Sequence, residues 1–523
     1  MATRLTAAVA ASALLPGIAV LGFVSSGNAS PVSMGGSSRP VTASACGGVP
    51  GDFNGDGHGD AVVDSPDYGA ATGHYGRGAV QVIYGGAAGL NIASSQIFDQ
   101  PALAGLGLPS GAIGFGASSA FGNFNGDCYA DAVIGTNAAD IVVLYGSATG
   151  LSASDGRVFD ANGVGDPSSV ADKFGSALAV GDFDGDGYAD IAAGAYESEA
   201  GEGGVGVLYG AATGVTATRA QWLTQDTAGV PGTAEPGDDF GQSLAAGDFT
   251  GDGKADLAVG SPNESIGSTP STGDVTILKG SSTGLTGSGS QAWSQDTAGV
   301  PGSNESTDGW GWSLAAGDIT GDGRADLVVG CQNEDLGGIT DAGSVTFLKG
   351  ASTGLTASGS TLWWQDSAGV PGIAEKSDRF GRSVAVGDFN GDGHADVVVG
   401  VPNEDLGTVS NAGTVDILFG TSTGPTGSHA ESWSQDSAGV AGTGETNDYF
   451  GYSMAAVPIV NPGREDLVVG VLGESTGTYR ENGAIQVFPS TSGGLTATGS
   501  KFIDGTVLAG GADNLALMGS WVS

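Results

Sequence analysis

A nine-residue segment rich in oxygen-bearing side chains recurs along the chain. At residues 388–396 it reads Asp-Phe-Asn-Gly-Asp-Gly-His-Ala-Asp, with side-chain oxygens at positions 1, 3, 5 and 9 and glycine at positions 4 and 6. Glycine allows the chain to bend sharply, so these oxygens can converge on one point. Converging carboxylates repel one another unless a hard cation lies among them, and Ca2+ accepts about six to eight oxygens in irregular geometry. The segment therefore predicts a calcium site.

Six copies of the segment keep this pattern and predict about six Ca2+ sites. The predicted side-chain ligands are Asp52, Asn54, Asp56, Asp60, Asn123, Asn125, Asp127, Asp131, Asp182, Asp184, Asp186, Asp190, Asp248, Thr250, Asp252, Asp256, Asp318, Thr320, Asp322, Asp326, Asp388, Asn390, Asp392 and Asp396. Position 7 varies freely, which suits a residue that binds only through its backbone carbonyl. The residues at position 7 are His58, Tyr129, Tyr188, Lys254, Arg324 and His394.

Two other interpretations of the segment are weaker. An EF-hand shares the opening of the pattern, but it needs flanking helices and a bidentate Glu at position 12, and neither is present. Metal-free Asp-Gly turns would explain the glycines but not six copies of one acid spacing.

The copies are expected to differ in affinity. The third has aspartate at all four ligand positions and is predicted to bind most tightly, while the second has Asn123 and Asn125 in place of acids and Cys128 in place of a glycine. Thr250 and Thr320 put a neutral hydroxyl at position 3. A seventh copy, at residues 457–465, keeps its flanks and loses the ligands.

The elements that carry these segments are short β-strands. The copies start 59 to 71 residues apart, which divides the chain into seven units. In one unit, four β-type runs at residues 240–246, 256–260, 274–279 and 291–295 are bounded by turn-forming residues, and helical periodicity is almost absent. This predicts an all-β fold, a seven-bladed β-propeller of four-stranded antiparallel blades. A parallel β-solenoid would instead repeat about every 20–30 residues.

The two ends of the chain are predicted to meet in one blade. The first unit lacks the strand that opens the others, and the segment 512–521 remains after the seventh unit. We expect the C-terminal strand to complete the first blade and to close the ring, because closure removes an unpaired sheet edge.

The charge of the chain excludes one class of partner. Its 523 residues include 57 Asp and Glu but 16 Lys and Arg, for a formal net charge of −41. A surface so poor in cations cannot displace the counterions of a phosphate backbone, so nucleic acid is excluded. Divalent cations would relieve the repulsion among the acids.

The N-terminus predicts export. Arg4, an apolar stretch at residues 5–24 and small residues at 27–29 indicate a signal peptide at 1–29, followed by a Ser/Gly-rich linker at 30–45 and the propeller at 46–523. An uncleaved membrane anchor is the alternative. No second hydrophobic span follows, so we expect a secreted, extracellular monomer with no membrane span after signal removal.

Three cysteines permit one intramolecular disulfide. Cys46 precedes the first segment and Cys128 lies in the second, so they are the predicted pair if the first two units are adjacent. Cys331 stands where sister units have Ser261 and Val401, which predicts an inert buried thiol.

The combined motif resembles the FG-GAP repeat of integrin α-subunit propellers. Phe-Gly opens the units at Phe240, Phe380 and Phe450, the acidic segment follows, and Gly-x-Pro ends the next strand at Pro262 and Pro402. The resemblance covers about residues 46–523. It implies a seven-bladed propeller with calcium in loops on one face, of a type common in secreted bacterial proteins and in some lectins. It implies no particular ligand, and we expect none of the further domains of an integrin.

Other repeated residues carry weaker indications. Trp222, Trp293, Trp364 and Trp433 recur on outer strands, where they either fill the contact between blades or form sugar-stacking platforms. Trp310 and Trp312 occur in the fifth unit alone and are the better candidates for a specific ligand contact. Asn-Glu pairs at Glu264, Glu334 and Glu404 are expected to form loop structure near the metals.

No catalytic set stands out from the repeat. Gly-x-Ser-x-Gly, the pattern of some hydrolase nucleophiles, occurs at residues 280–284, 350–354 and 420–424, always in one phase of the repeat, which indicates a turn. The sequence therefore predicts a non-enzymatic binding or adhesion module for an unknown extracellular protein or surface ligand. A carbohydrate-binding lectin is the alternative, and a polysaccharide-active enzyme is third.

Overall fold

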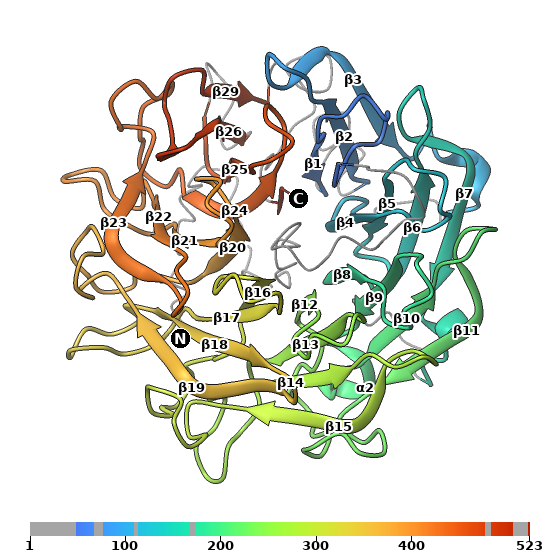
Figure 1. Ribbon diagram of the computed structural model, residues 1–523, viewed down its shortest axis with the longest axis horizontal. Coiled ribbons are helices and arrows are strands. Elements are labelled where there is room, and N and C mark those ends of the chain that lie inside the picture. The colour runs from blue at the N-terminus through green and yellow to red at the C-terminus, as the bar shows by residue number, and fades with distance from the viewer. Residues whose placement is uncertain are drawn as a thin grey trace, which may run out of the picture.

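Seven four-stranded antiparallel sheets stand around a central axis, as Figure 1 shows. The computed structural model describes residues 49–66, 77–108, 113–167, 173–475, 483–505 and 521–522. Each sheet is one blade, with its first strand nearest the axis and its last strand at the rim. The predicted fold class, a seven-bladed β-propeller, is confirmed.

The blades contain nearly all of the regular structure. From the axis outward, the first three blades are β30 (Trp521–Val522), β1 (Ala61–Ser65), β2 (Ala79–Tyr84) and β3 (Asn91–Asp99); β4 (Ser118–Gly122), β5 (Asp131–Gly135), β6 (Asp140–Tyr145) and β7 (Ser152–Asp160); and β8 (Leu178–Gly181), β9 (Asp190–Gly194), β10 (Val205–Tyr209) and β11 (Thr216–Leu223). The fourth and fifth are β12 (Ser243–Gly247), β13 (Asp256–Ser261), β14 (Asp274–Lys279) and β15 (Thr286–Trp293); and β16 (Ser313–Gly317), β17 (Asp326–Cys331), β18 (Ser344–Ala351) and β19 (Gly354–Trp363). The last two are β20 (Ser383–Gly387), β21 (Asp396–Val401), β22 (Thr414–Phe419) and β23 (Thr426–Trp433); and β24 (Phe450–Val457), β25 (Asp466–Val471), β26 (Ala484–Phe488) and β29 (Lys501–Asp504). Outside the blades, the described residues form a small hairpin of β27 (Ser490–Thr491) and β28 (Gly494–Leu495) and three short helices, η2 (Ala104–Leu106), α1 (Ala161–Val164) and α2 (Ser198–Gly201).

The C-terminal strand closes the ring, as predicted. β30 pairs antiparallel with β1, with Val63 opposite Val522 and Asp64 opposite Trp521. The rest of the predicted closing segment, residues 512–520, lies outside the described residues. A backbone bond also joins the last blade to the first, because Gly59 N donates to Pro458 O at 2.9 Å.

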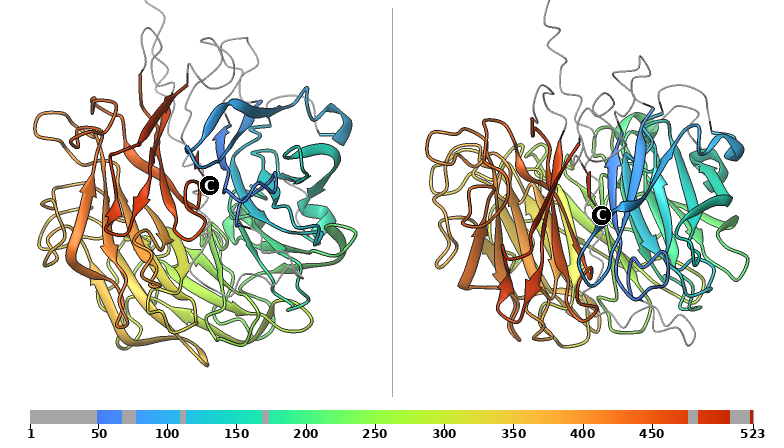
Figure 2. Two further views of the ribbon diagram at one scale, coloured as in Figure 1. Left: turned by 45° about the horizontal axis from the view of Figure 1, so that its top comes forward. Right: turned by 90° about the horizontal axis from the view of Figure 1, so that it is seen from above.

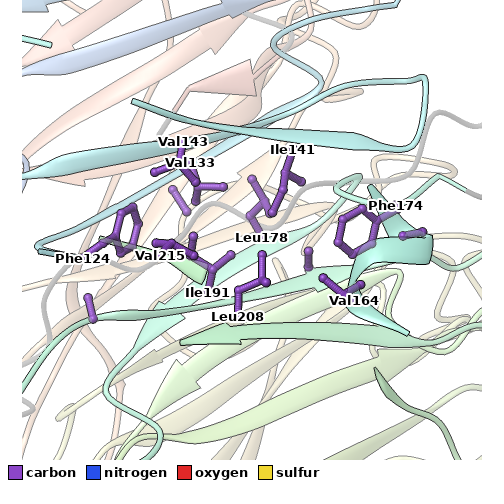
Figure 3. Packing of buried hydrophobic residues seen from close by; sticks show 14 of the residues in the cluster. Phe124, Val133, Ile141, Val143, Val164, Phe174, Leu178, Ile191, Leu208 and Val215 are labelled. Atoms are coloured by element: carbon purple, nitrogen blue, oxygen red, sulfur yellow. The ribbon is translucent and has the colours of Figure 1, made fainter. Parts of the chain in front are cut away.

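The apolar core lies between the blades. Seven clusters of buried side chains each join two neighbouring blades, and one of them joins the seventh blade to the first through Val457, Ile459 and Ala61. Figure 3 shows the cluster between the second and third blades, where Val143 and Phe124 face Ile191 and Leu208. Strands buried on both faces explain the continuous apolar runs in the sequence.

The predicted strands of the fourth unit match the structure except at the rim. The runs at 256–260 and 274–279 correspond to β13 and β14, and the first run starts three residues before β12. The last predicted strand, 291–295, overlaps β15 only at residues 291–293, because β15 covers Thr286–Trp293. The glycines and serines of this segment are typical of turns, which is why the sequence did not predict a strand there. In the structure the segment pairs with β14 through a bulge and exposes polar side chains at the rim.

The propeller has two different faces, and the strands run between them in the right-hand view of Figure 2. The Asp face carries the loops that lead into the second strand of each blade, at residues 52–60, 123–131, 182–190, 248–256, 318–326, 388–396 and 458–466. The connector face carries the longer links between blades, such as 294–312 and 364–382, and the links between second and third strands, such as 332–343.

Close backbone contact between blades makes one prediction. A Cβ added at Gly194, the last residue of β9, would lie 2.0 Å from the carbonyl oxygen of Gly241 in the next blade. Because the carbonyl is packed backbone that cannot move aside as a flexible side chain could, Gly194→Ala should lower the free energy of unfolding by about 1–3 kcal/mol, measured by urea unfolding. Gly463→Ala is the matched control, since a Cβ there meets no atom within 4 Å. Equal stability of the two variants would contradict the close contact.

Candidate metal sites

Hydrogen bonds from its own backbone hold each loop of the Asp face. In the third loop, Asp182 Oδ1 accepts from Gly185 N at 2.7 Å and from Asp186 N at 3.1 Å, and its Oδ2 accepts from Gly187 N at 2.9 Å. The aspartate at position 5 also accepts a bond from the backbone of its own loop, because Asp186 Oδ1 accepts from Tyr188 N at 3.0 Å. The carboxylates are thus oriented by the turn itself, and all predicted side-chain ligands lie in the segments that lead into the second strands of the blades.

The second loop shows why glycine is preferred at position 6. Cys128 stands there with φ of 82°, where the other five loops have glycine at φ between 86° and 94°. Cys128 takes part in a disulfide, which supplies a reason for a non-glycine residue in this conformation. Its predicted partner, Cys46, lies outside the described residues, so that pairing stays a prediction.

The aspartate at position 9 joins two parts of its blade. Asp190 Oδ2 accepts from Phe183 N at 2.9 Å within the loop, and Asp190 Oδ1 accepts from Gly210 N at 2.9 Å beyond the third strand. All seven loops have this buried, doubly bonded carboxylate, at Asp60, Asp131, Asp190, Asp256, Asp326, Asp396 and Asp466. Position 9 is therefore architectural whether or not an ion is bound.

The seventh loop corrects the sequence interpretation. Val457 pairs with Asp466, just as Gly247 pairs with Asp256 in the fourth blade, so the copy occupies residues 458–466 rather than 457–465. The shift of one residue hid the retained Asp466. Positions 1 and 5 are Pro458 and Pro462, so this loop keeps the architectural carboxylate without the other acids.

Three of the four predicted ligands of the third loop come together. Asp182, Asp184 and Asp190 each offer a carboxylate oxygen, and these atoms lie within 4.8 Å of one another. The fourth predicted ligand, Asp186, is exposed and lies outside this group. This geometry suits a cation better than any other group of acids on the described Asp face.

Basic side chains compete with a cation in three loops. Arg219 Nη2 lies 2.7 Å from Asp184 Oδ2, Lys254 Nζ lies 3.5 Å from Asp252, and Arg324 and Lys349 approach Asp322 at 3.6 and 3.0 Å. In these loops a basic side chain, and not only a hard cation, therefore reduces the repulsion among the acids. Arg219 reaches the third loop from β11, a contact that no local motif reveals, and it opposes the tight binding that four aspartates predict.

Burial makes the architectural carboxylates hard to ionise without a cation. It raises the pKa of Asp190 to about 8 and that of Asp60 to about 7, against the opposing effect of two backbone hydrogen bonds and with a further increase from neighbouring aspartates. Asp131 and Asp396 likewise have pKa values of about 8, again raised mainly by burial. A bound cation would favour the ionised form and reverse this effect.

Neighbouring loops are joined around the ring. The N–H at position 8 donates to the carbonyl at position 1 of the preceding loop, as in Ala255 N to Asp182 O at 2.8 Å. The side chain at position 7 packs over the glycine at position 4 of the preceding loop, with Tyr129 over Gly55 and Tyr188 over Gly126. Position 7 therefore has a packing role beside the predicted carbonyl role.

The remaining predicted contacts are mostly core. Trp310 is fully buried, occupies the place of phenylalanine in the Phe-Gly position, and donates through Nε1 to Thr346 Oγ1 at 3.2 Å. A ligand contact at Trp310 is therefore ruled out by its burial. Trp312 is half-buried, and its ring faces the Arg382 guanidinium at 5.5 Å.

The outer-strand tryptophans pack between blades. Register aligns Trp293, Trp363 and Trp433, opposite Val275, Val345 and Val415, so Trp222 and Trp364 do not belong to this set. Trp293 is 8% exposed, and Trp433 packs on Phe488 at 5.3 Å between ring centroids. Cys331 is free and buried, as predicted.

The Asn-Glu pairs do not lie near the Asp-rich loops. Glu264 and Glu334 follow the second strands of their blades, whereas the loops precede those strands. The pairs therefore belong to the connector face, and the expectation that they lie near the calcium sites predicted in the Asp-rich loops is wrong.

Comparison with known proteins identifies the repeat. Residues 174–209, 240–278, 310–348 and 380–418 match the family model of the FG-GAP repeat. These segments are the third to sixth units, and each runs from the Phe-Gly position, or Trp310 in its place, to the third strand of a blade.

Curated relatives match over part of their length. The chain is 30% identical to phosphatidylinositol-glycan-specific phospholipase D of Rattus norvegicus over 159 residues, which are 30% of this chain and 18% of that protein. It is 30% identical to integrin alpha-8 of Mus musculus over 255 residues, which are 47% of this chain and 21% of that protein. The Dictyostelium discoideum phospholipase D matches at 26% over 222 residues, 41% of this chain and 23% of that protein. The chain thus spans less than a quarter of the length of these relatives.

The seventh loop provides a control for the role of position 9. Asp466→Asn loses one carboxylate oxygen that accepts a backbone N–H, so it should lower the free energy of unfolding by about 1–3 kcal/mol, equally in calcium and in EDTA. Asp396→Asn removes the same bonds and a predicted ligand, so its loss should be larger in calcium. Thermal and urea unfolding of both variants in each buffer measure this. An identical calcium dependence for the two variants would argue against a ligand role for Asp396.

The raised pKa values predict how stability changes with pH in EDTA. Below about pH 4 these carboxyls are protonated in both states; between that pH and about 8 the folded state holds more protons, so raising the pH favours unfolding. The melting temperature should therefore fall from about pH 4 to about pH 8. Excess calcium should reduce this fall, because the ion stabilises the ionised form. Melting curves recorded across this pH range test the prediction. A melting temperature that rises with pH in EDTA would contradict it.

Proposed function

We propose that this chain, an FG-GAP repeat β-propeller related to integrin α subunits and to phosphatidylinositol-glycan-specific phospholipase D, is a secreted binding or adhesion module stabilised by calcium. The observation that carries the proposal is the third loop, where three carboxylates gather within 4.8 Å around one point. The loops at residues 52–60, 123–131, 248–256, 318–326 and 388–396 repeat its turn and most of its oxygen donors. Within the described residues no helix is long and apolar enough to cross a membrane.

Calcium in these loops would stabilise more than the loop that holds it. Each loop accepts a backbone hydrogen bond from the next blade, so a cation that fixes one loop also fixes a contact between blades. The donors fit a hard cation, because they are carboxylate, amide and hydroxyl oxygens. Ca2+ would supply positive charge to a chain with a formal net charge of −41.

The connector face is the better place for a partner. Its links between blades are longer than the loops of the Asp face, and Ile373, on one of these links, is 71% exposed. Loops of this kind, held on a rigid scaffold, are the usual sites of recognition. Catalysis has less support, because the Gly-x-Ser-x-Gly segments are turns between third and fourth strands, as between β18 and β19.

A carbohydrate ligand is the alternative. The burial of Trp293 and the packing of Trp433 on Phe488 disfavour a ring of exposed stacking platforms. A glycan array probed with the purified chain distinguishes a protein-binding module from a lectin, because calcium-dependent glycan binding would favour the lectin. Turnover of a polysaccharide would contradict both binding hypotheses.

Calcium titration tests the stabilising role directly. A single site that binds only the folded state adds about 2.7 kcal/mol when calcium is at 100 times its Kd, so several sites should raise the melting temperature clearly. The chain purified in EDTA should melt at a lower temperature, and added Ca2+ should restore it. Magnesium at the same ionic strength is the control for general charge screening. A melting temperature indifferent to EDTA and calcium would contradict the proposal.

A further inference from the structure

A second set of carboxylates lies on the connector face, at the opposite end of the blades from the Asp-rich loops. In the fifth unit, Glu305, Asp308 and Glu334 each offer an oxygen, and these atoms lie within 4.8 Å of one another. Asp308 and Glu334 are each 1% exposed, while Glu305 is exposed. Glu305 and Asp308 precede β16, and Glu334 follows β17, so the fold brings together two segments of the chain.

A buried side-chain amide contacts this carboxylate cluster. Gln295, 2% exposed, donates through Nε2 to Glu334 Oε2 at 2.5 Å, and its Oε1 has no hydrogen-bond partner. An acceptor buried without a partner costs free energy, and native structures leave few of them. The orphaned oxygen belongs to the same amide that touches the carboxylates, so a cation among them could contact it.

The contact between the buried glutamine and the glutamate occurs four times. Besides the fifth unit, the equivalent residues are Gln225, Glu235, Asp238 and Glu264; Gln365, Glu375, Asp378 and Glu404; and Gln435, Glu445, Asp448 and Glu474. In each set the glutamine donates to the glutamate that follows the second strand, at 2.5 to 2.7 Å, and the glutamine Oε1 has no partner. One orphaned acceptor could be an accident of side-chain placement, but four at one position indicate a common cause.

Within the part of the chain that the structure describes, no ion pair involves Glu305, Asp308 or Glu334, whereas those of Asp184, Asp252 and Asp322 lie at Asp-rich loops. The Cys331 thiol donates to Glu334 Oε2 at 3.3 Å, but it brings no positive charge.

We propose that Glu305, Asp308 and Glu334, with Gln295 Oε1, form a divalent-cation site on the connector face. The donors are all oxygens, so the site would take a hard cation of the Ca2+ class. Gln295 follows β15 of the fourth blade, whereas Glu334 belongs to the fifth, so the ion ties two blades together at the end opposite the Asp-rich loop. The three equivalent sets would do the same for their pairs of blades.

Crystals of the full chain soaked in Mn2+ or Tb3+ test the site by anomalous scattering. The expected result is a peak bounded by Glu305, Asp308 and Glu334, separate from any peaks at the Asp-rich loops. Peaks at the loops alone, or no peak at all, would overturn the site. Because the two sets lie on opposite faces, this result is read independently of the proposed calcium sites in the loops.

Equilibrium dialysis with Ca2+ tests the site in solution. Glu305→Gln weakens the site and Glu305→Lys puts an ammonium group beside it; both change an exposed side chain, so the fold should remain. At least the lysine variant should bind one ion fewer per chain than the natural protein. Asp155→Asn, which removes an exposed carboxylate from β7, should leave the number of ions unchanged. An unchanged number in both Glu305 variants would show that the acids share protons instead of a cation and would overturn the proposal.

Discussion

The contact between consecutive Asp-rich loops is the constraint on which the rest of this propeller depends. Each loop must offer its first carbonyl to the next blade and also hold its ninth aspartate between its own backbone and the end of the third strand. Both bonds use backbone groups that would otherwise be buried without partners. The seventh loop keeps both although it has lost the other acids, so blade packing requires them independently of any ion.

Acid is concentrated where blades meet, on both faces of the ring. On the Asp face, part of the charge is met by Arg219, Lys254, Arg324 and Lys349. On the connector face the carboxylates face one another and buried amides, without a basic partner among the described residues. Interfaces between blades are held by apolar clusters in the middle. Cations at the two ends would therefore complement the hydrophobic contact rather than replace it.

Local patterns were sufficient to predict most of the fold. Turn residues and short apolar runs predicted the four strands of a blade, because each strand pairs with its neighbour in sequence. The prediction misplaced the bounds of β15, where a rim strand exposes serine and glycine, and it missed Asp466, where proline-rich sequence hid the phase of the seventh copy. Trp310 was misjudged because its rarity suggested a ligand contact, while its position in the repeat is that of a core phenylalanine.

The sequence by itself determined the repeat, the number of blades and the positions of acids in each loop, because these are carried by segments of about nine residues whose turns form from their own hydrogen bonds. The tertiary structure alone decided which charges meet. Arg219 reaches Asp184 from the rim of the blade, and Gln295 reaches Glu334 from the blade before it. Such contacts join residues far apart in the chain, and they depend on how blades twist and pack, which no local spacing records.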